Sequence, residues 1–287
     1  MRRIREAGAI VLAKSNLAEF AFTAFETVGS MLPGWTFNPY ALNRVTAGSS
    51  GGTAAAVAAN LGLVGLGSDT GNSIRGPSAH NALVGIRSTQ GLTSRDGIIP
   101  LFANRDVGGP MTRTVEDAVR IFDVISGTDP ADPVTAEADA HRPATYMDAL
   151  ETGVAGLRVG VPRWMVYTET ADPEVLERFE AAVADLRRLG VTVVDDVPLP
   201  EYDSLRRGLS CPRFRYDIER YLATLPNPPV RTLKEIEEGG KVHVTVMPRV
   251  KSFLEFEGTP ETNEGCIQAT RNEELLRQAV RRAFAAA

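Results

Sequence analysis

The sequence has few cysteines, histidines and aromatic residues, and no long apolar run. Of its 287 residues, 2 are cysteines, 3 are histidines and 7% are aromatic. No apolar stretch approaches the roughly 20 residues that a bilayer-spanning helix needs, so we expect no membrane span. The 31 basic and 36 acidic side chains give a net charge of −5. Because nucleic-acid binding requires a basic surface, this charge balance argues against a nucleic-acid partner.

Cys211 and Cys266 lie far apart in the sequence and are too few for a disulfide framework or a metal site. We expect both to be reduced thiols, as is usual in a cytoplasmic protein. Residues 1–3 and the apolar stretch that follows them resemble a signal peptide, but Glu6 and Lys14 bracket a short apolar core. We therefore interpret this segment as part of the fold and expect a cytoplasmic location.

Apolar periodicity and helix-end signals predict alternating strands and helices. The expected strands are 9–13, 63–66, 157–161 and 191–194, and the expected helices are 54–60, one opening at 76–77, one capped by Thr114, 173–189, 203–225 and 273–287. Asn16 followed by Glu19 suggests a capping box for a further helix. The stretch 128–145 is rich in turn formers and reads as a linker. The strand-helix-strand order over 157–194 favours a parallel pair of strands.

Two glycine-rich loops that carry serine stand out in the first half of the chain. The first is Ala47-Gly48-Ser49-Ser50-Gly51-Gly52-Thr53, and the second runs from Gly67 to Pro77. An alanine-rich helix and an apolar strand separate them, and such a unit can bring both loops to the same end of a sheet. Glycines in the second loop leave successive backbone N–H groups free to converge on one point, as an oxyanion hole requires.

These loops resemble the signature of the amidase signature family. The resemblance extends to Gly8–Asn16, Arg95–Pro100 and Gly109–Thr114, and it covers about half of the chain. It implies an α/β fold in which helices flank a mixed β-sheet. We interpret 1–287 as a single domain fragment of that fold, with a signature core over 1–127, a linker-like excursion over 128–155 and a variable α/β region over 156–287.

The resemblance also implies a serine, cis-serine, lysine mechanism for cleaving a small-molecule carboxamide, with no metal or cofactor. By motif position Ser73 is the nucleophile, and Ser49 is the serine that follows a cis peptide bond and relays the proton. The backbone amides expected to form the oxyanion hole belong to Thr70, Gly71, Asn72 and Ser73. The side chains expected to hold the loops together are those of Ser50, Asp69 and Arg75. Asn72 stands where the family more often has glycine, which suggests a narrower acyl pocket.

The family's catalytic base is a buried lysine in an apolar-Lys-Asp motif well upstream of the cis-serine loop. None of the residues before Ser49 matches that motif, and Lys14 matches a different family position. The far end of the chain resembles a family helix without the strand that follows it. We therefore expect an interior slice of the family domain, truncated at both ends, in which amide hydrolysis is impaired. Loss of one member of such a triad leaves roughly 10³–10⁴-fold catalysis over water.

Three alternatives follow from the same residues. Gly48–Gly52 also fits Gly-x-Ser-x-Gly, in which Ser50 would attack and a histidine would act as base in an α/β hydrolase. The candidate histidines are His80, His141 and His243. The absent lysine motif favours a second alternative, a non-catalytic pseudoenzyme or gene fragment. A nucleotide-binding protein is the third, but neither loop contains a phosphate-binding glycine motif. The amide substrate and the oligomeric state stay open.

Overall fold

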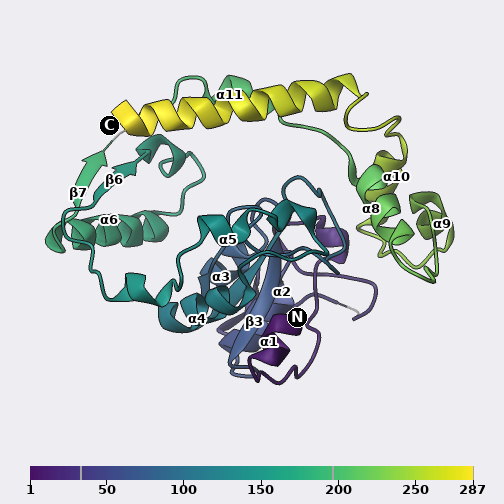
Figure 1. The fold of residues 1–287 in the computed structure, drawn as a ribbon, viewed down its shortest axis with the longest axis horizontal. Coiled ribbons are helices and arrows are strands. Elements are labelled where there is room, and N and C mark those ends of the chain that lie inside the picture. Colours follow the sequence, from purple (N-terminus) through teal and green to yellow (C-terminus); the bar gives the residue numbers. More distant parts are fainter. Residues whose placement is uncertain (33, 196, 287) are drawn as a thin grey trace. The chain divides into compact units, whose positions relative to one another are not determined.

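The computed structural model describes residues 1–32, 34–195 and 197–286, and its ribbon is drawn in Figure 1. Contacts divide the chain into two compact units. The first comprises Met1–Leu150 and Arg213–Phe256, and the second comprises Glu151–Pro212 and Glu257–Ala287. The expected α/β class is confirmed, although the strands of the described residues form three small sheets. The assignment of 1–287 to a single domain, with divisions after residues 127 and 155, stays a prediction.

The first unit contains short strands, short helices and the lobe formed by 213–256. Its strands are β1 (Phe37–Asn38), β2 (Ala41–Val45), β3 (Val64–Asp69), β4 (Val84–Gly85) and β5 (Val107–Thr112). Its helices are α1 (Arg2–Glu6), α2 (Gly51–Ala58), α3 (Arg75–His80), α4 (Val115–Ile125), α5 (Ala138–His141), α8 (Phe214–Ala223), α9 (Leu233–Glu238) and α10 (Met247–Leu254). Single 3₁₀ turns lie at η1 (Glu19–Ala21), η2 (Pro133–Thr135) and η3 (Met147–Leu150).

A three-stranded antiparallel sheet in the order β3-β5-β4 underlies the two glycine loops. Strand β3 confirms the strand expected at 63–66 and continues to Asp69, where it pairs with Val107. Helix α2 packs against β3, beside which it lies in Figure 1, and against β5. The approach is close, because a Cβ on Gly65 would lie 2.3 Å from Cγ2 of Thr53. The glycines of this strand therefore let the helix that follows the first loop pack tightly on the sheet.

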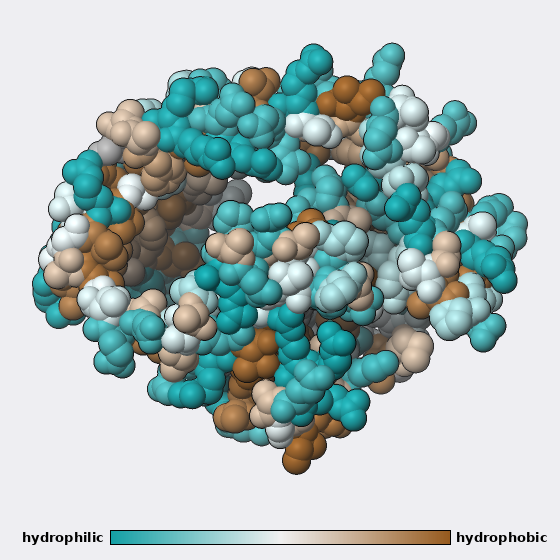
Figure 2. Space-filling view, viewed as in Figure 1, coloured by the Kyte–Doolittle hydropathy of each residue, from teal (hydrophilic) through white to brown (hydrophobic). Residues whose placement is uncertain are grey.

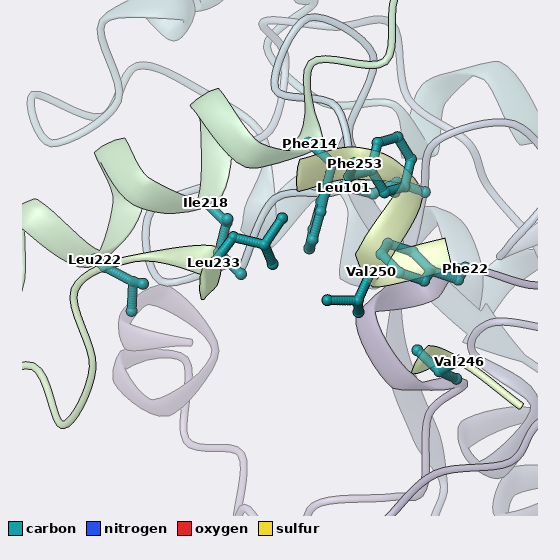
Figure 3. Packing of buried hydrophobic residues seen from close by; sticks show 9 residues of the cluster. All are labelled: Phe22, Leu101, Phe214, Ile218, Leu222, Leu233, Val246, Val250 and Phe253. Carbon is teal, nitrogen blue, oxygen red and sulfur yellow. The ribbon is translucent and has the colours of Figure 1, made fainter. Parts of the chain in front are cut away.

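Helices α8, α9 and α10 enclose the main hydrophobic cluster of the first unit (Figure 3). The buried residues of this cluster are Phe22, Leu101, Phe214, Ile218, Leu222, Leu233, Val246, Val250 and Phe253. Ring pairs such as Phe22 with Phe214, whose centroids are 4.7 Å apart, add edge contacts to the burial of apolar area. The cluster thereby ties the 213–256 lobe to Phe22 and Leu101, which belong to the N-terminal segment and the turn before β5.

The second unit contains the strands β6 (Arg158–Val161) and β7 (Thr192–Asp195), the turn η4 (Arg163–Met165) and the helices α6 (Pro173–Arg188), α7 (Tyr202–Arg207) and α11 (Glu264–Ala286). The parallel pairing of β6 with β7 confirms the prediction from the strand-helix-strand order. Asp172 caps α6 by accepting a hydrogen bond from the N–H of Glu174 at 2.8 Å. The single helix expected over 203–225 is wrong, because α7 ends at Arg207 and α8 begins at Phe214.

Cys211 and Cys266 form a disulfide in the second unit, so the expectation of two reduced thiols is wrong. The fold brings together two residues that are 55 positions apart, one after α7 and the other near the start of α11. The chain between them leaves the second unit at Pro212, contributes 213–256 to the first unit and returns at Glu257. Sequence spacing alone cannot reveal such a pairing, because it depends on how α7 and α11 pack.

The N-terminal segment also differs from expectation. Residues 9–13 form no strand, and Ile10 and Leu12 are 84% and 72% exposed, so the buried strand predicted there is wrong. Asn16 caps no helix, because its side chain donates instead to Oγ1 of Thr36 at 3.0 Å. Other hydrophobic residues are also exposed on the face of the molecule in Figure 2, which is otherwise largely hydrophilic. Among the described residues, no helix is both long and apolar enough to cross a membrane.

The segment expected as a linker over 128–145 contains η2 and α5 and is anchored by a buried acid. Asp132 accepts hydrogen bonds from the N–H of Arg95 at 2.8 Å and from its guanidinium at 2.9 and 2.6 Å. Burial raises the pKa of the Asp132 carboxyl, but these bonds outweigh burial and lower the pKa below its ordinary value.

The expected cap of α4 is confirmed, since Thr114 Oγ1 accepts from the N–H of Asp117 at 3.1 Å.

Reduction of the Cys211–Cys266 disulfide should lower the free energy of unfolding by up to about 4 kcal/mol. The bond joins residues 55 positions apart, and a crosslink across a loop of that length restricts the unfolded chain. Urea unfolding with and without a reducing agent measures the change. A variant carrying both Cys211→Ser and Cys266→Ser is the control, since its stability should not respond to the reductant. Free thiols in the denatured, unreduced protein would contradict the pairing.

Asp132→Asn should lower the free energy of unfolding by about 2 kcal/mol at neutral pH, because it weakens hydrogen bonds made to a charged group. The pKa of Asp132 is lower in the folded chain than in the unfolded one. Its stabilisation is therefore present above the unfolded value near pH 4 and is lost as the pH falls through the folded pKa. The variant should show a shallower loss of stability between pH 5 and pH 3.

The matched control for this pH experiment is Asp185→Asn, which removes an exposed ion pair with Arg188 and should change stability little. Chemical denaturation at a series of pH values gives both measurements. Equal acid dependence in the wild type and in Asp132→Asn would rule out the role assigned to the Asp132 carboxylate.

Candidate active site

The first glycine loop is clamped by the segment 18–26. The Gly48–Ser49 peptide bond is cis, as the resemblance implies. The N–H of Gly48 donates to the carbonyl of Ala24 at 2.9 Å, and the Ser49 carbonyl accepts from the N–H of Ala18 at 2.9 Å. A Cβ on Gly48 would lie 2.3 Å from the carbonyl oxygen of Glu26. The backbone of another segment thus occupies the space that any side chain at position 48 would need.

The two glycine loops meet directly, which confirms the expectation that the helix-strand unit brings them together. The N–H of Ser50 donates to the carbonyl of Ser73 at 3.2 Å. The Ser50 hydroxyl donates to the carbonyl of Ser68 at 3.1 Å and accepts from its N–H at 3.2 Å. Ser50 therefore joins the end of β3 to the first loop through its side chain and to the second loop through its backbone.

Asp69, at the end of β3, organises the second loop from inside. Its carboxylate is fully buried and accepts hydrogen bonds from the N–H of Ile74 at 3.0 Å and of Arg75 at 3.4 Å. The Arg75 guanidinium donates to the same carboxylate at 3.3 Å and to the Gly71 carbonyl at 2.6 Å. The loop thus folds back around a buried anion, and the structure brings together Asp69 and Arg75, whose expected role in holding the two loops in register stays a prediction.

The backbone N–H groups of Thr70, Gly71, Asn72 and Ser73 make no hydrogen bond to any described residue. This is unusual, because most backbone N–H groups in folded proteins are paired. Bonded donors follow at once, since Ile74 and Arg75 donate to Asp69 and Gly76 donates to the Asn72 carbonyl at 2.8 Å. A short run of unpaired donors therefore lies beside Ser73, which is the arrangement that can bind a developing negative charge.

The two serines expected to act in catalysis are both buried. Ser49 is 1% exposed and Ser73 is 5% exposed. Within the described residues, neither hydroxyl makes a side-chain hydrogen bond, in contrast to the neighbouring Ser50. Among the described residues, the enclosed side-chain polar atoms without a hydrogen-bond partner are Ser78 Oγ and Asn81 Oδ1, so neither the Ser49 nor the Ser73 hydroxyl is an enclosed, unpartnered group.

The side chain of Asn72 lies against Gly76 at the start of α3. A Cβ on Gly76 would fall 2.1 Å from Nδ2 of Asn72. Asn72 is therefore accommodated because residue 76 is glycine, and its backbone N–H stays unpaired among the described residues. The narrower acyl pocket suggested by this substitution stays a prediction.

Ser50 has contacts that differ from those of a nucleophile. It is fully buried, and its hydroxyl is bonded to both backbone groups of Ser68. His80 and His141 are exposed, and Nδ1 of His243 is bonded to the Thr245 hydroxyl at 2.8 Å. In the part of the chain that the structure describes, no hydrogen bond joins Ser50 to a histidine. The geometry therefore gives the α/β hydrolase alternative no base.

Sequence reasoning missed two residues that hold the second loop. The Arg87 guanidinium binds both the carbonyl and the carboxylate of Asp69, the latter at 2.9 Å, and donates to the Arg105 carbonyl at 3.0 Å. Asp106 accepts from the Thr70 hydroxyl at 2.5 Å. No short motif indicates either role, because each contact joins positions that become neighbours only when β3, β5 and β4 pair in one sheet.

No lysine lies where a buried base would be expected. Every lysine of the chain, namely Lys14, Lys234, Lys241 and Lys251, is exposed. A lysine acts as a base only when burial or nearby positive charge favours its neutral form. The residues described here also contain no group of three or more His, Cys, Asp or Glu side chains suited to a metal ion.

Gly48→Ala should lower the free energy of unfolding by about 1–3 kcal/mol, because the added methyl group must displace the backbone of 23–26. The new Cβ would lie 2.3 Å from the Glu26 carbonyl oxygen and 2.7 Å from that of Thr23. Urea denaturation measures the loss. Gly62→Ala is the control, because its Cβ would meet its nearest neighbour at 3.6 Å. Equal stability of the two variants would contradict the close approach at Gly48.

Comparisons with known proteins agree with this geometry. The Amidase family model matches residues 1–287. A glutamyl-tRNA(Gln) amidotransferase subunit of Microcystis aeruginosa is 38% identical over 227 residues, which are 79% of this chain and 43% of that protein. The native peptide amidase of Stenotrophomonas maltophilia superposes with a TM-score of 0.79 at 35% identity, over 93% of this chain and 56% of that one.

An amidase family protein of Bacillus anthracis superposes with a TM-score of 0.82 at 28% identity and covers 98% of this chain and 58% of that one. The chain thus spans less than half of the amidotransferase protein that it matches and somewhat more than half of these two solved structures. Because the family model matches the whole chain, the chain belongs to the amidase family, which carries the amidase signature.

Proposed function

We propose that this chain carries the acyl-transfer site of a serine amidase, which cleaves a carboxamide C–N bond through an acyl-enzyme. The observation that carries the proposal is the run of backbone N–H groups over residues 70–73 that are unpaired among the described residues and lie beside Ser73, itself a buried residue. Membership of the amidase family supports the same reaction class. Its relatives include a peptide amidase and a glutamyl-tRNA(Gln) amidotransferase protein, and both are consistent with an amide substrate.

In this proposal the Ser73 Oγ attacks the carbonyl carbon of the amide. Its proton passes through the Ser49 hydroxyl to a base, because a serine hydroxyl is a weak nucleophile until a neighbouring base removes its proton. The carbonyl oxygen becomes an oxyanion and is stabilised by the N–H groups of Thr70, Gly71, Asn72 and Ser73. The C–N bond then breaks, the leaving nitrogen takes a proton, and water hydrolyses the ester formed on Ser73.

The support for the roles of the two serines is their burial and the contact between their loops. The hydrogen bond from the N–H of Ser50 to the Ser73 carbonyl ties the residue after Ser49 to the nucleophile's own backbone. Ser50, Asp69 and Arg75 act as supports in this proposal, since their polar groups are already used in holding the loops.

The site lacks one component that the mechanism needs. Each lysine of the chain is exposed, so none has the burial that a neutral, proton-accepting amine requires. Hydrolysis by these 287 residues alone is therefore proposed to be impaired. The same observation favours a second candidate, an amidase-like pseudoenzyme that keeps the pocket without turnover.

The proposed partner is a small-molecule amide. The net charge of −5 gives no support to a nucleic-acid partner. The cytoplasmic location and the absence of a cofactor, both expected from the sequence, stay predictions.

Ser73→Ala should abolish covalent labelling by a fluorophosphonate, a probe that transfers its phosphonyl group to an activated serine Oγ with loss of fluoride. Peptide mapping by mass spectrometry locates the modified residue. Ser78→Ala is the matched control, because Ser78 is a buried serine on α3 outside both glycine loops and its loss should leave labelling in place.

The outcomes separate the candidates. Labelling of Ser73 in the wild type supports the serine amidase, and labelling that survives Ser73→Ala rejects Ser73 as the nucleophile. Modification of Ser50 would instead support the α/β hydrolase. A wild-type chain that no fluorophosphonate labels would favour the pseudoenzyme.

A further inference from the structure

A buried carboxylate outside the two glycine loops contacts the proposed oxyanion loop. Asp106 immediately precedes β5 and is 4% exposed. Its Oδ2 accepts hydrogen bonds from the N–H of Leu101 at 2.9 Å and of Phe102 at 3.1 Å. Its Oδ1 accepts from the Thr70 hydroxyl at 2.5 Å. The carboxylate therefore closes the turn 101–106 on one side and holds Thr70 on the other.

The strand register explains why these two residues meet. Strands β3 and β5 are antiparallel, and their last pair is Asp69 with Val107. One step further along both strands, Thr70 lies opposite Asp106. Their side-chain hydrogen bond continues the pairing of the two strands beyond the ladder, at the point where the backbone leaves β3 and enters the loop with unpaired N–H groups.

The loop is thus anchored at both ends. Asp69 accepts the N–H groups of Ile74 and Arg75 at its far end, and Asp106 holds Thr70 at its near end. Only Gly71, Asn72 and Ser73 lie between these anchors. The backbone dihedral angles of these three residues set the directions of their N–H groups. Because both ends of the segment are fixed, those directions are restricted.

The number of donors at this contact also favours a carboxyl group over an amide side chain. Burial is the largest effect and raises the pKa of the Asp106 carboxyl above its ordinary value, while the hydrogen bonds from Thr70, Phe102 and Leu101 offset only part of that rise. A buried acid carries a desolvation cost that is offset only when its acceptors are filled. In Asp106 the donors approach both carboxyl oxygens. An asparagine side chain has a single acceptor oxygen, so it could not accept all of these hydrogen bonds.

We propose that Asp106 is a positioning residue for the oxyanion loop, which it orients by holding the Thr70 hydroxyl. This inference rests on the proposed function, since the loop is assigned as the oxyanion hole there. Asp106 touches neither the nucleophile nor the proposed substrate, and it acts through Thr70 on the N–H groups of 71–73.

The test compares Asp106→Ala, Thr70→Val and the double variant with the wild type. The probe is a fluorophosphonate, and its saturation kinetics separate the apparent binding constant from the maximal rate of labelling at Ser73. Misdirected oxyanion donors should slow the maximal rate about 10-fold or more, because one such donor is worth about 10²–10³ in rate. The apparent binding constant should stay within about 2-fold, since the lost interaction belongs to the transition state.

The double variant provides a criterion that general destabilisation does not meet. Asp106→Ala and Thr70→Val break the same hydrogen bond, so the double variant should be no slower than the slower single variant. Additive losses would overturn the proposal. Thr70→Val also keeps the Asp106 carboxylate and its bonds to the turn, and it serves as the test if Asp106→Ala fails to fold.

Asp132→Asn is the matched control. Asp132 is likewise a buried carboxylate that accepts a backbone N–H and a guanidinium, but both belong to Arg95, and no hydrogen bond joins it to the described residues of the loop 70–75. It should leave the maximal rate of labelling unchanged. A loss in Asp132→Asn equal to that in Asp106→Ala would show that any buried acid has the same effect and would overturn the proposal.

Hydrogen exchange separates failure of this inference from failure of the proposed function. The hydrogen-bonded amides of Ile74 and Arg75 should exchange about 10-fold faster or more in Asp106→Ala and Thr70→Val, and at the wild-type rate in Asp132→Asn. If the wild type is never labelled, the proposed function fails and exchange alone decides whether Asp106 orders the loop. Unchanged exchange at Ile74 and Arg75, or unchanged labelling where the wild type is labelled, would overturn the proposal.

Discussion

The buried carboxylate of Asp69 is the constraint on which the rest of the site depends. A fully buried anion is costly, and here two backbone N–H groups and the guanidinium groups of Arg75 and Arg87 offset that cost. Because Asp69 accepts the N–H groups of 74 and 75, the loop folds back on itself. The donors of 70–73 are left outside this arrangement, and the unpaired run beside Ser73 is the result.

Close backbone packing explains why both loops are rich in glycine. Carbonyl groups of 23–26 lie where a side chain on Gly48 would be, and the Asn72 amide occupies the corresponding space at Gly76. At Gly67, a Cβ would lie 2.8 Å from the Ser50 hydroxyl. These glycines let three segments approach one another more closely than side chains would allow, so the hydroxyl of Ser50 can reach both backbone groups of Ser68.

Local sequence signals predicted those features whose causes are local. The cap of α4 depends on Thr114 and Asp117 alone, and the parallel pair β6 and β7 follows from one strand-helix-strand unit. Residues 9–13 have a strand-like composition, but without a neighbouring strand among the described residues they stay exposed. Asn16 has the spacing of a helix cap, but its side chain donates a hydrogen bond to Thr36 instead. For Asn16, a bond to a residue 20 positions away replaces the helix cap. For residues 9–13, a strand does not form because no described strand pairs with them.

The two serine loops themselves were recognisable because their motif is contiguous. Two further supports were not, since Arg87 and Asp106 reach the loop only after β3, β5 and β4 have paired. The same holds for Asp217 on α8, which accepts from the N–H of Ala103 at 2.9 Å while Arg213 donates to both of its carboxylate oxygens. Arg213 and Asp217 have the i,i+4 spacing of a helical pair, but the contact of Asp217 with Ala103 follows no spacing rule, and only the folded chain reveals it.

The disulfide between Cys211 and Cys266 also turns part of the chain into a closed covalent ring. That ring includes all of α8, α9 and α10, which belong to the first unit although both cysteines belong to the second. A protease that cuts once inside the ring opens it without dividing the molecule, because the sulfur bridge still joins the two pieces. The fragments come apart only after reduction, so a denaturing gel run without a reductant leaves a nick among these helices as a single band.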